Sequence, residues 1–179
     1  MLLDRIAPPD ARGRVDTTFV PAPPGGVFAA LQQIVPAELP RIGFVFRALP
    51  WLLPFEAEKP LYAQMLDAGF AVMGATPLRE VVLGRVARPL GVLRPEPRVK
   101  SRRELAAFEK AGHVKVALGF ALCQEEEQGK SGTRVSATMK LWPAKPGGTP
   151  GLAWIWPGMD LAGGIFARDW LRALSDRSG

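Results

Sequence analysis

The stretch TTFVPAPPGGVFAALQQI, residues 17–34, joins a short alternating segment directly to a helical one. Pro24 suits the first position of a helix, because the N–H group that proline lacks would have no acceptor within the helix there. The apolar residues that follow recur at the spacing of one helical face: Val27, Phe28, Leu31, Ile34 and Val35. The pattern predicts a strand that passes into a helix, and Pro36 is expected to end that helix.

A second helical pattern closes the chain, in MDLAGGIFARDWLRALSD, residues 159–176. Its charged face carries Arg168 and Arg172, and the apolar stripe opposite consists of Met159, Ala162, Gly163, Phe166, Trp170, Ala173 and Leu174. A glycine inside a helix costs about 1 kcal/mol relative to alanine, so something should compensate at Gly163 and Gly164. Close packing of the helix backbone on a sheet would compensate, and so would space for a ligand beside the helix.

Segments with the alternation of strands lie between the two helices. The clearest is HVKVALGFALC, residues 113–123, and its expected inner face consists of Val114, Val116, Leu118, Phe120 and Leu122. TRVSATMKLW, residues 133–142, alternates in the same way and is expected to bury Val135, Ala137, Met139 and Leu141. FAVMGAT and REVVLGRVARP, residues 70–76 and 79–89, predict a hairpin that turns near Pro77.

The remaining segments are shorter. Residues 1–13 are polar and rich in proline, which predicts an ordered-to-loose lead-in before a strand that starts near Val15. Residues 61–69, which end in a glycine, and residues 102–110 predict two short helices. Residues 41–55 fit a short buried helix or an irregular strand, and we favour the helix.

Length and composition predict a single domain, residues 1–179, of the α+β class. The chain has 179 residues, of which 47% are hydrophobic, so it can bury one sizeable core. No apolar run reaches the roughly 20 residues of a membrane-spanning helix, and residues 1–14 contain no apolar core of the length typical of a signal peptide. We therefore expect no transmembrane segment and a cytoplasmic location, with which the single cysteine, Cys123, agrees. The bias toward Ala, Gly, Pro and Arg is typical of a GC-rich bacterial genome.

The net charge of +6 raises the question of a nucleic-acid partner. The basic residues are scattered along the chain, and only residues 94–103 are locally dense in them. No stacking platform of aromatic residues interleaves with a basic stripe. We therefore expect no specific nucleic-acid partner, and the sequence leaves the oligomeric state open.

No motif for catalysis, a metal or a cofactor withstands inspection. GKSGT, residues 129–133, is similar to the end of a phosphate-binding loop, but three glutamates precede it and a strand follows it. Residues 125–132 are therefore expected to form a charged loop between strands. His113 and Cys123 would lie roughly 33 Å apart on one strand, and we expect both at the surface or on the second face of the sheet. We predict no catalytic residue, no metal and no cofactor.

Two charged residues interrupt otherwise apolar segments. Arg47 stands in FVFRALP, and Glu80 stands in REVVLG. A charged group in such a place is paired, is exposed at a strand edge, or points into a cavity toward a ligand. Arg47 and Glu80 are therefore the candidate polar anchors for a ligand.

Taken together, these segments resemble the START-like superfamily, also called the SRPBCC or helix-grip proteins. The resemblance spans nearly the whole chain, and it is carried by FVPAPPGGVFAAL, GFAVMG, REVVLGRVARP, VKVALGFAL, TRVSATMKL and PGMDLAGGIFARDWLRAL. It implies a curved antiparallel sheet wrapped around a long C-terminal helix, with short helices after the first strand. Relatives hold lipids, sterols, polyketides or other apolar molecules between sheet and helix. Relatives often have an acidic residue and an arginine where this chain has Met139 and Lys140, and no family catalytic residue carries over.

The first functional hypothesis is non-enzymatic binding of a hydrophobic small molecule or lipid in an internal cavity. The second is an enzyme of the cyclase, aromatase or hydrolase type that acts on a hydrophobic substrate in the same cavity, with Glu80 or Arg47 assisting. The third is an interaction module that has a filled core and no ligand. The expected lining of the cavity is Phe70, Val82, Val116, Leu118, Phe120, Gly163, Phe166 and Trp170.

Overall fold

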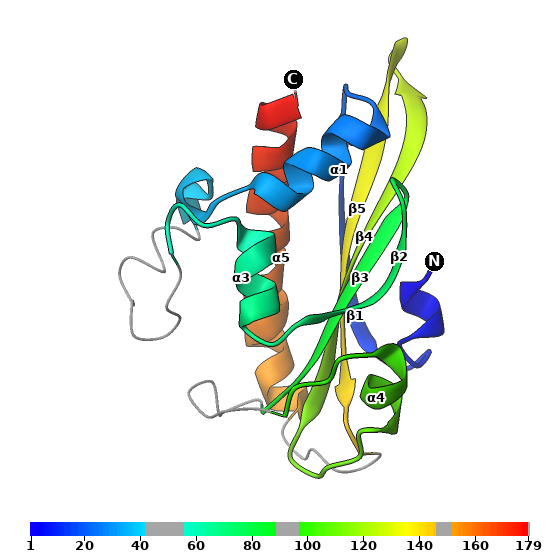
Figure 1. The fold of residues 1–179 in the computed structure, drawn as a ribbon, viewed down its shortest axis with the longest axis vertical. Helices are drawn as coiled ribbons and strands as arrows, with labels where there is room; N and C mark the ends of the chain where they lie inside the picture. The colour runs from blue at the N-terminus through cyan, green and yellow to red at the C-terminus, as the bar shows by residue number, and fades with distance from the viewer. Residues whose placement is uncertain (42–55, 89–96, 146–151, 179) are drawn as a thin grey trace.

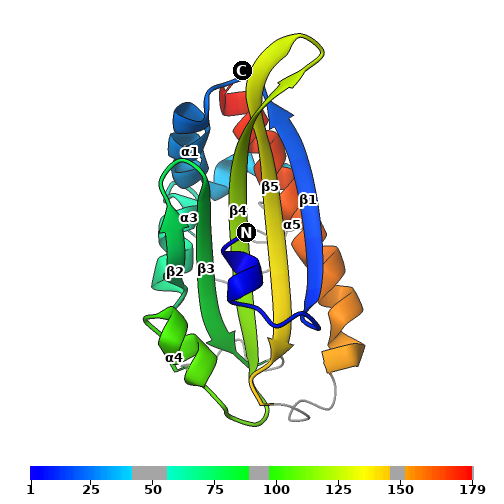
Figure 2. The same ribbon diagram turned by 90° about the vertical axis from the view of Figure 1, so that its right-hand side faces the viewer.

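In the part of the chain that the structure describes, five antiparallel strands form one sheet in the order β1-β5-β4-β3-β2 (Figures 1 and 2). The structure is a computed structural model, and it describes residues 1–41, 56–88, 97–145 and 152–178. The strands are β1 (Arg12–Val20), β2 (Ala71–Thr76), β3 (Glu80–Ala87), β4 (Val114–Glu127) and β5 (Lys130–Pro143). The expected α+β class and antiparallel sheet are confirmed.

Helices cover both faces of this sheet. The longer ones are α1 (Pro24–Gln33), α3 (Leu61–Asp67), α4 (Arg102–Ala107) and α5 (Leu152–Ser178), and two short 3₁₀ helices are η1 (Leu3–Arg5) and η2 (Pro36–Glu38). The long C-terminal helix α5 lies with α1 and α3 on one face, called the inner face below (Figure 1). The N-terminal helix η1 and α4 lie on the opposite, outer face (Figure 2).

Local sequence signals set most of the element boundaries. Pro24 is the first residue of α1, as predicted, and the helix ends at Gln33, before Pro36. Gly69, two residues after the end of α3, has a φ of +96°, a backbone conformation that glycine adopts without steric cost. The hairpin of β2 and β3 also forms as predicted, with Thr76 opposite Glu80.

The segment 125–132, which was predicted to be a charged loop between two strands, is a hairpin in which most of these residues are paired in the strands. Strand β4 continues to Glu127, which lies opposite Lys130, and only Gln128 and Gly129 form the turn. The physical reason is charge pairing across the strands. Arg134 forms ion pairs of 2.7 Å with both Glu125 and Glu127, so opposite charges face each other where the sequence suggested a solvated run.

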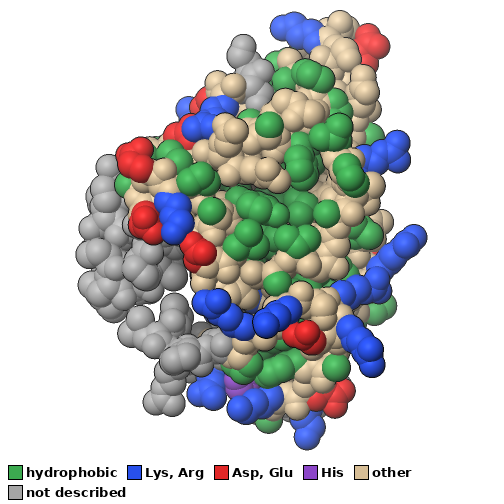
Figure 3. All heavy atoms as spheres, viewed as in Figure 1, with side chains coloured by type: hydrophobic (Ala, Val, Ile, Leu, Met, Phe, Trp, Pro, Cys, Tyr) green, Lys and Arg blue, Asp and Glu red, His purple; other side chains and the backbone are tan. Residues whose placement is uncertain are grey.

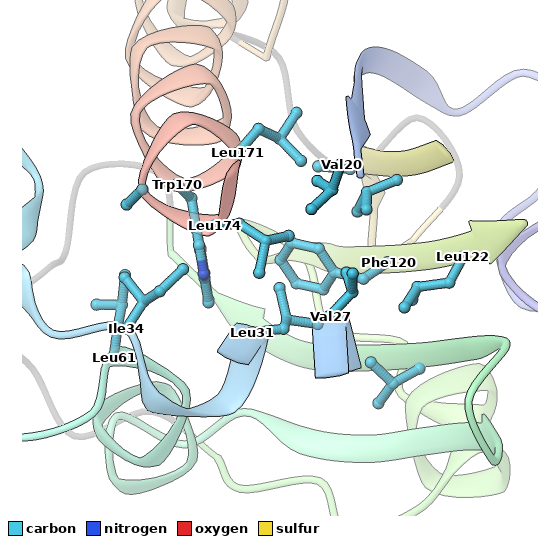
Figure 4. Packing of buried hydrophobic residues seen from close by; sticks show 14 of the residues in the cluster. Val20, Val27, Leu31, Ile34, Leu61, Phe120, Leu122, Trp170, Leu171 and Leu174 are labelled. Atoms are coloured by element: carbon cyan, nitrogen blue, oxygen red, sulfur yellow. The ribbon is translucent and has the colours of Figure 1, made fainter. Parts of the chain in front are cut away.

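The inner core forms where α1, α3 and α5 pack on the sheet. Trp170 of α5 lies 4.9 Å from Phe120 of β4 between ring centroids, and 5.2 Å from Phe166. Leu31 of α1 and Leu174 of α5 pack around the same rings (Figure 4). The predicted inner face of β4 is confirmed, because Val114, Val116, Leu118, Phe120 and Leu122 all pack on this side.

The outer face is also a core, which the sequence did not predict. Ala117 is 0% exposed, and the polar residues His113 and Lys115 on the same face are 1% and 6% exposed. His113 is therefore on the second face but not at the surface, whereas Cys123 is exposed. The outer core consists of Leu3, Ala7, Met73, Val82, Val86, Val99, Leu105, Ala117 and Trp142.

The N-terminal segment, which the sequence predicted as an ordered-to-loose lead-in, is ordered and covers this outer face. Strand β1 begins at Arg12, and Leu3 is 1% exposed. The backbone N–H of Leu2 donates to a carboxylate oxygen of Glu80 at 2.8 Å, and Lys140 forms an ion pair with Asp4 at 2.9 Å. Leu3 lies so close to Gly119 that a Cβ there would be 3.1 Å from its Cδ2 atom.

Two further expectations concern helix lengths and the ambiguous segment. The helix expected over residues 102–110 ends at Ala107. The helix favoured for residues 41–55 falls on positions 42–55, which lie outside the described residues, as does Arg47.

Truncation of Leu3 tests whether the N-terminal segment is part of the core. We expect Leu3→Ala to lower the free energy of unfolding by about 2–5 kcal/mol, as for other buried leucines. Leu161→Ala, at a leucine on α5 that is 62% exposed, is the matched control and should change it by less than about 0.5 kcal/mol. Urea denaturation measures both. Equal small effects would show that residues 1–13 do not contribute to stability.

Lys115 is a charged residue inside the outer core. Its Nζ donates to the backbone oxygen of Ala106 in α4 at 2.9 Å. Burial lowers the pKa of Lys115, and the nearby charge of Glu109 opposes part of this effect. Because its pKa is lower in the folded than in the unfolded chain, the unfolded chain binds more protons below pH 10.5, and stability should rise with pH in that range.

The variant Lys115→Met tests this pH dependence. We expect the free energy of unfolding of the wild type, relative to that of Lys115→Met, to increase as the pH rises from about 8 toward 10.5. The reason is that only the wild type has the buried amine. Urea denaturation at several pH values gives the difference. Lys110→Met, at an exposed lysine, should leave the pH dependence as in the wild type. Parallel curves for wild type and Lys115→Met would refute the expectation.

Candidate functional site

A small cavity lies between α5 and the inner face of β1, β5 and β4. Its volume is about 40 Å³, which is room for very few water molecules. Its lining is mostly apolar, with one charged corner, and consists of Arg14, Asp16, Leu118, Gly119, Phe120, Ala137, Thr138, Met139, Gly163, Phe166, Ala167 and Trp170.

The structure brings five of the predicted lining residues to this cavity: Leu118, Phe120, Gly163, Phe166 and Trp170. Val116 packs instead with Leu141 in a neighbouring cluster of the inner face, and Phe70 contacts the edge of that cluster. Val82 is buried in the outer core, on the opposite side of the sheet. The register explains its position, because Val82 pairs with Gly119, which faces Leu3.

The candidate polar anchors are not at the cavity. Glu80 accepts hydrogen bonds from the backbone N–H groups of Leu2 and Leu3, at 2.8 and 3.4 Å, and so holds the N-terminal segment on the outer face. Arg47 lies outside the described residues. The polar groups that line the cavity are therefore different from the predicted ones.

Gly163 allows the tip of Met139 to touch the helix backbone. A Cβ at Gly163 would lie 2.6 Å from Met139 Cε and 3.1 Å from its Sδ, closer than real atoms approach. The thioether therefore occupies a notch that only glycine leaves open. Since Met139 ends in a flexible, unbranched chain, it can leave this notch at lower cost than a branched residue could.

Gly164 allows the guanidinium group of Arg14 of β1 to pack against the helix backbone. A Cβ at Gly164 would lie 2.6 Å from the Nε atom of Arg14 and would also overlap its guanidinium carbon. Arg14 and Met139 are cross-strand partners in the sheet. Two adjacent side chains of the sheet thus fill two adjacent glycine notches of α5, and close packing explains the helix-interior glycines.

Arg14 is held by two carboxylates. Its Nε and Nη2 atoms donate to the two oxygens of Asp16 at 2.6 and 3.0 Å, and its Nη1 atom lies 3.5 Å from Asp160 of α5. These contacts raise the pKa of Arg14, chiefly through the hydrogen bonds to Asp16. The side chains of Arg14 and Asp16 are 26% and 13% exposed, so the pair sits at the border of the cavity and solvent.

Sequence reasoning missed Arg14 and Asp16, although a signal was present. Side chains two residues apart in a strand share a face, and Val20 is an obvious core residue. Counting back from Val20 in steps of two places Asp16 and Arg14 on the inner face. A strand that starts only near Val15 leaves Arg14 outside the alternating pattern, and a charged pair near the start of a strand is typical of an exposed surface.

The inner core also comes to the surface beside the helices. Figure 3 shows hydrophobic side chains gathered across the middle of this face, above a group of Lys and Arg side chains. Half-buried residues that pack against the inner core include Phe28 of α1, Tyr62 and Leu66 of α3, and Phe70. Burial raises the pKa of Tyr62. Apolar surface is therefore continuous from the outside to the inner core on this side.

The ionisable side chains of the described lining are Arg14 and Asp16, which form an ion pair with each other. Asp16 is the carboxylate of the lining, and both of its oxygens accept hydrogen bonds from Arg14. Within the described residues, no group of three or more His, Cys, Asp or Glu side chains is placed to hold a metal ion. No described helix has both the length and the hydrophobicity needed to cross a bilayer.

Comparison with known proteins adds no assignment. No family model matches the sequence, and no curated protein matches it either.

The contact between Gly164 and Arg14 can be tested with alanine substitutions. Alanine in place of a helical glycine gains about 1 kcal/mol, and we expect this gain for Gly158→Ala, where no atom lies near the added Cβ. Gly164→Ala should lose the gain, because Arg14 must leave its notch. In an Arg14→Ala background, Gly164→Ala should recover about 1 kcal/mol. Urea denaturation of the four variants measures this coupling, and an equal gain at both glycines would contradict the packing described.

Proposed function

We propose that the protein binds a small hydrophobic molecule between the sheet and α5, without transforming it. The observation that carries the proposal is the cavity itself, a partly open space between sheet and helix with a mostly apolar lining and a charged corner. The architecture adds support, since a five-stranded antiparallel sheet packs against a long C-terminal helix as in the START-like proteins that the sequence resembles. Relatives in that superfamily carry apolar ligands between the same two elements.

The size of the cavity constrains the way a ligand would enter. About 40 Å³ does not hold a lipid or a sterol, so a ligand must displace side chains. Met139 is the best candidate for displacement, because it lines the cavity, it is only partly buried, and its tip rests in the Gly163 notch without a polar bond. The ligand would take the place of the thioether against the helix backbone.

Binding is favoured over catalysis by the groups that the described lining offers. The described lining has no His, Cys, Ser or Lys side chain that could act as base or nucleophile. Its one carboxylate, Asp16, is occupied by Arg14. We therefore place the non-enzymatic hypothesis first.

Removal of the Met139 side chain tests the proposal. We expect Met139→Ala to bind N-phenyl-1-naphthylamine, a neutral apolar fluorescent probe, about fivefold to tenfold more tightly than the wild type, since each further buried methylene contributes about 0.8 kcal/mol. Met73→Ala is the control, because Met73 is also a methionine of the sheet but is buried in the outer core. It should lose stability without gaining affinity. Fluorescence titration gives the dissociation constants.

Gly163→Leu supplies the opposite change. Its side chain would fill the notch and push Met139 into the cavity, so the probe should bind more weakly while circular dichroism shows an intact fold. A folded Gly163→Leu variant that binds the probe as the wild type does would count against the cavity. No binding of the probe by either the wild type or Met139→Ala would refute the proposed function and favour a filled-core interaction module.

A further inference from the structure

We infer that the ligand carries a neutral oxygen acceptor, such as a carbonyl or hydroxyl group, and that Arg14 holds this oxygen while rejecting a carboxylate. This inference rests on the proposed function and names the class of ligand for the same cavity. Three observations support it: the donors that lining residues leave without acceptors, the balance of charge around Arg14, and the cost of displacing Asp16.

The lining residues have hydrogen-bond donors to spare. A guanidinium group has five N–H donors, and within the described residues Arg14 directs one each from Nε, Nη1 and Nη2 to Asp16 and Asp160. One N–H on each Nη atom is left over. The indole N–H of Trp170, a residue that also lines the cavity, is buried and has no partner among the described residues.

These unpaired N–H donors indicate which chemical group the ligand should carry. An unsatisfied buried donor costs about 1–3 kcal/mol, so an acceptor that reaches it is favoured. An N–H group can only donate. An oxygen with free lone pairs can accept a hydrogen bond from such a group, whereas an ammonium group, which is only a donor, cannot.

The positive charge of Arg14 is already compensated. Its guanidinium group forms ion pairs with two anions, Asp16 and Asp160. A ligand carboxylate would therefore meet no uncompensated positive charge, and it would be repelled by Asp16 on the same guanidinium.

A carboxylate could bind Arg14 closely only by displacing Asp16. The side chain of Asp16 is 13% exposed, so it would be left as a largely buried anion without its partner. Breaking one side of such a pair is costly, because the remaining charge is poorly solvated. A neutral oxygen avoids this cost, since it can use the spare Nη hydrogens while Asp16 stays in place.

The test compares two compounds that differ only in the head group. Octanoic acid and methyl octanoate are used to displace N-phenyl-1-naphthylamine from the protein at about pH 7.5, where the acid is ionised. We expect the ester to compete better with the wild type. Because the ester is also the more hydrophobic compound, the decisive quantity is how the ratio of the two competition constants changes with the charge beside Arg14.

Asp16→Asn removes one negative charge and frees Arg14. It should shift the ratio toward octanoic acid by about fivefold, which is the upper effect of a partly exposed charge pair. Asp160→Asn removes a charge 3.5 Å from Arg14 at a more exposed position, and should shift the ratio in the same direction by less. If Asp16→Asn does not fold, Asp160→Asn alone still decides the test. Asp176→Asn, an exposed residue of α5, is the charge-matched control and should leave the ratio unchanged.

The outcomes separate the inference from the proposed function. A shift toward the acid in Asp16→Asn or Asp160→Asn, without one in Asp176→Asn, supports the inference. Octanoic acid competing better with the wild type, or ratios equal in all variants, would overturn the inference and leave the cavity as a binding site. Failure of N-phenyl-1-naphthylamine to bind would overturn the proposed function, and this inference with it.

Discussion

The closeness of α5 to the sheet at Gly163 and Gly164 is the constraint on which the rest of the structure depends. At this point the helix backbone itself is the surface against which Met139 and Arg14 pack. These two side chains are neighbours across β5 and β1, so one helix position is tied to two strands and to their register. A side chain at either glycine would move the helix away from the sheet or expel its partner. The cavity, its charged corner and the path that a ligand would take all follow from this contact.

The outer core stabilises the sheet through contacts on the face opposite the cavity. Strand β4 is buried on both faces, with Phe120 directed to α5 and Ala117 to the N-terminal segment. The carboxylate of Glu80 belongs to this support, because it ties the first residues of the chain to the start of β3. A sheet that is packed on its outer side can tolerate rearrangement on its inner side. Binding that displaces Met139 therefore need not destabilise the whole domain.

The sequence predicted those parts of the structure in which each residue type agrees with its surroundings. The alternation from Val114 to Leu122 identified the inner face of β4, since every second residue there is apolar. The same rule did not reveal the outer core, because His113 and Lys115 are polar and look exposed. Residues 81–83 are all apolar and do not alternate with polar residues. The local sequence therefore did not indicate that Val82 faces the outer core. The charged corner of the cavity was not predicted for a related reason. Arg14 and Asp16 form their hydrogen bonds only in the folded chain, and in the sequence they have the pattern of exposed residues.

The register of β1 with β5 determines when this fold can be completed. Arg12 lies opposite Leu141, so a strand near the beginning of the chain pairs with one near its end. Forming contacts so distant in sequence closes a very long loop, and the entropy of closure is lost before the contacts stabilise the fold. Such topologies fold slowly. During synthesis β1 leaves the ribosome long before β5, and α5, which covers the inner face, emerges after all five strands. The nascent chain therefore exposes the apolar inner face of the sheet until α5 has been synthesised.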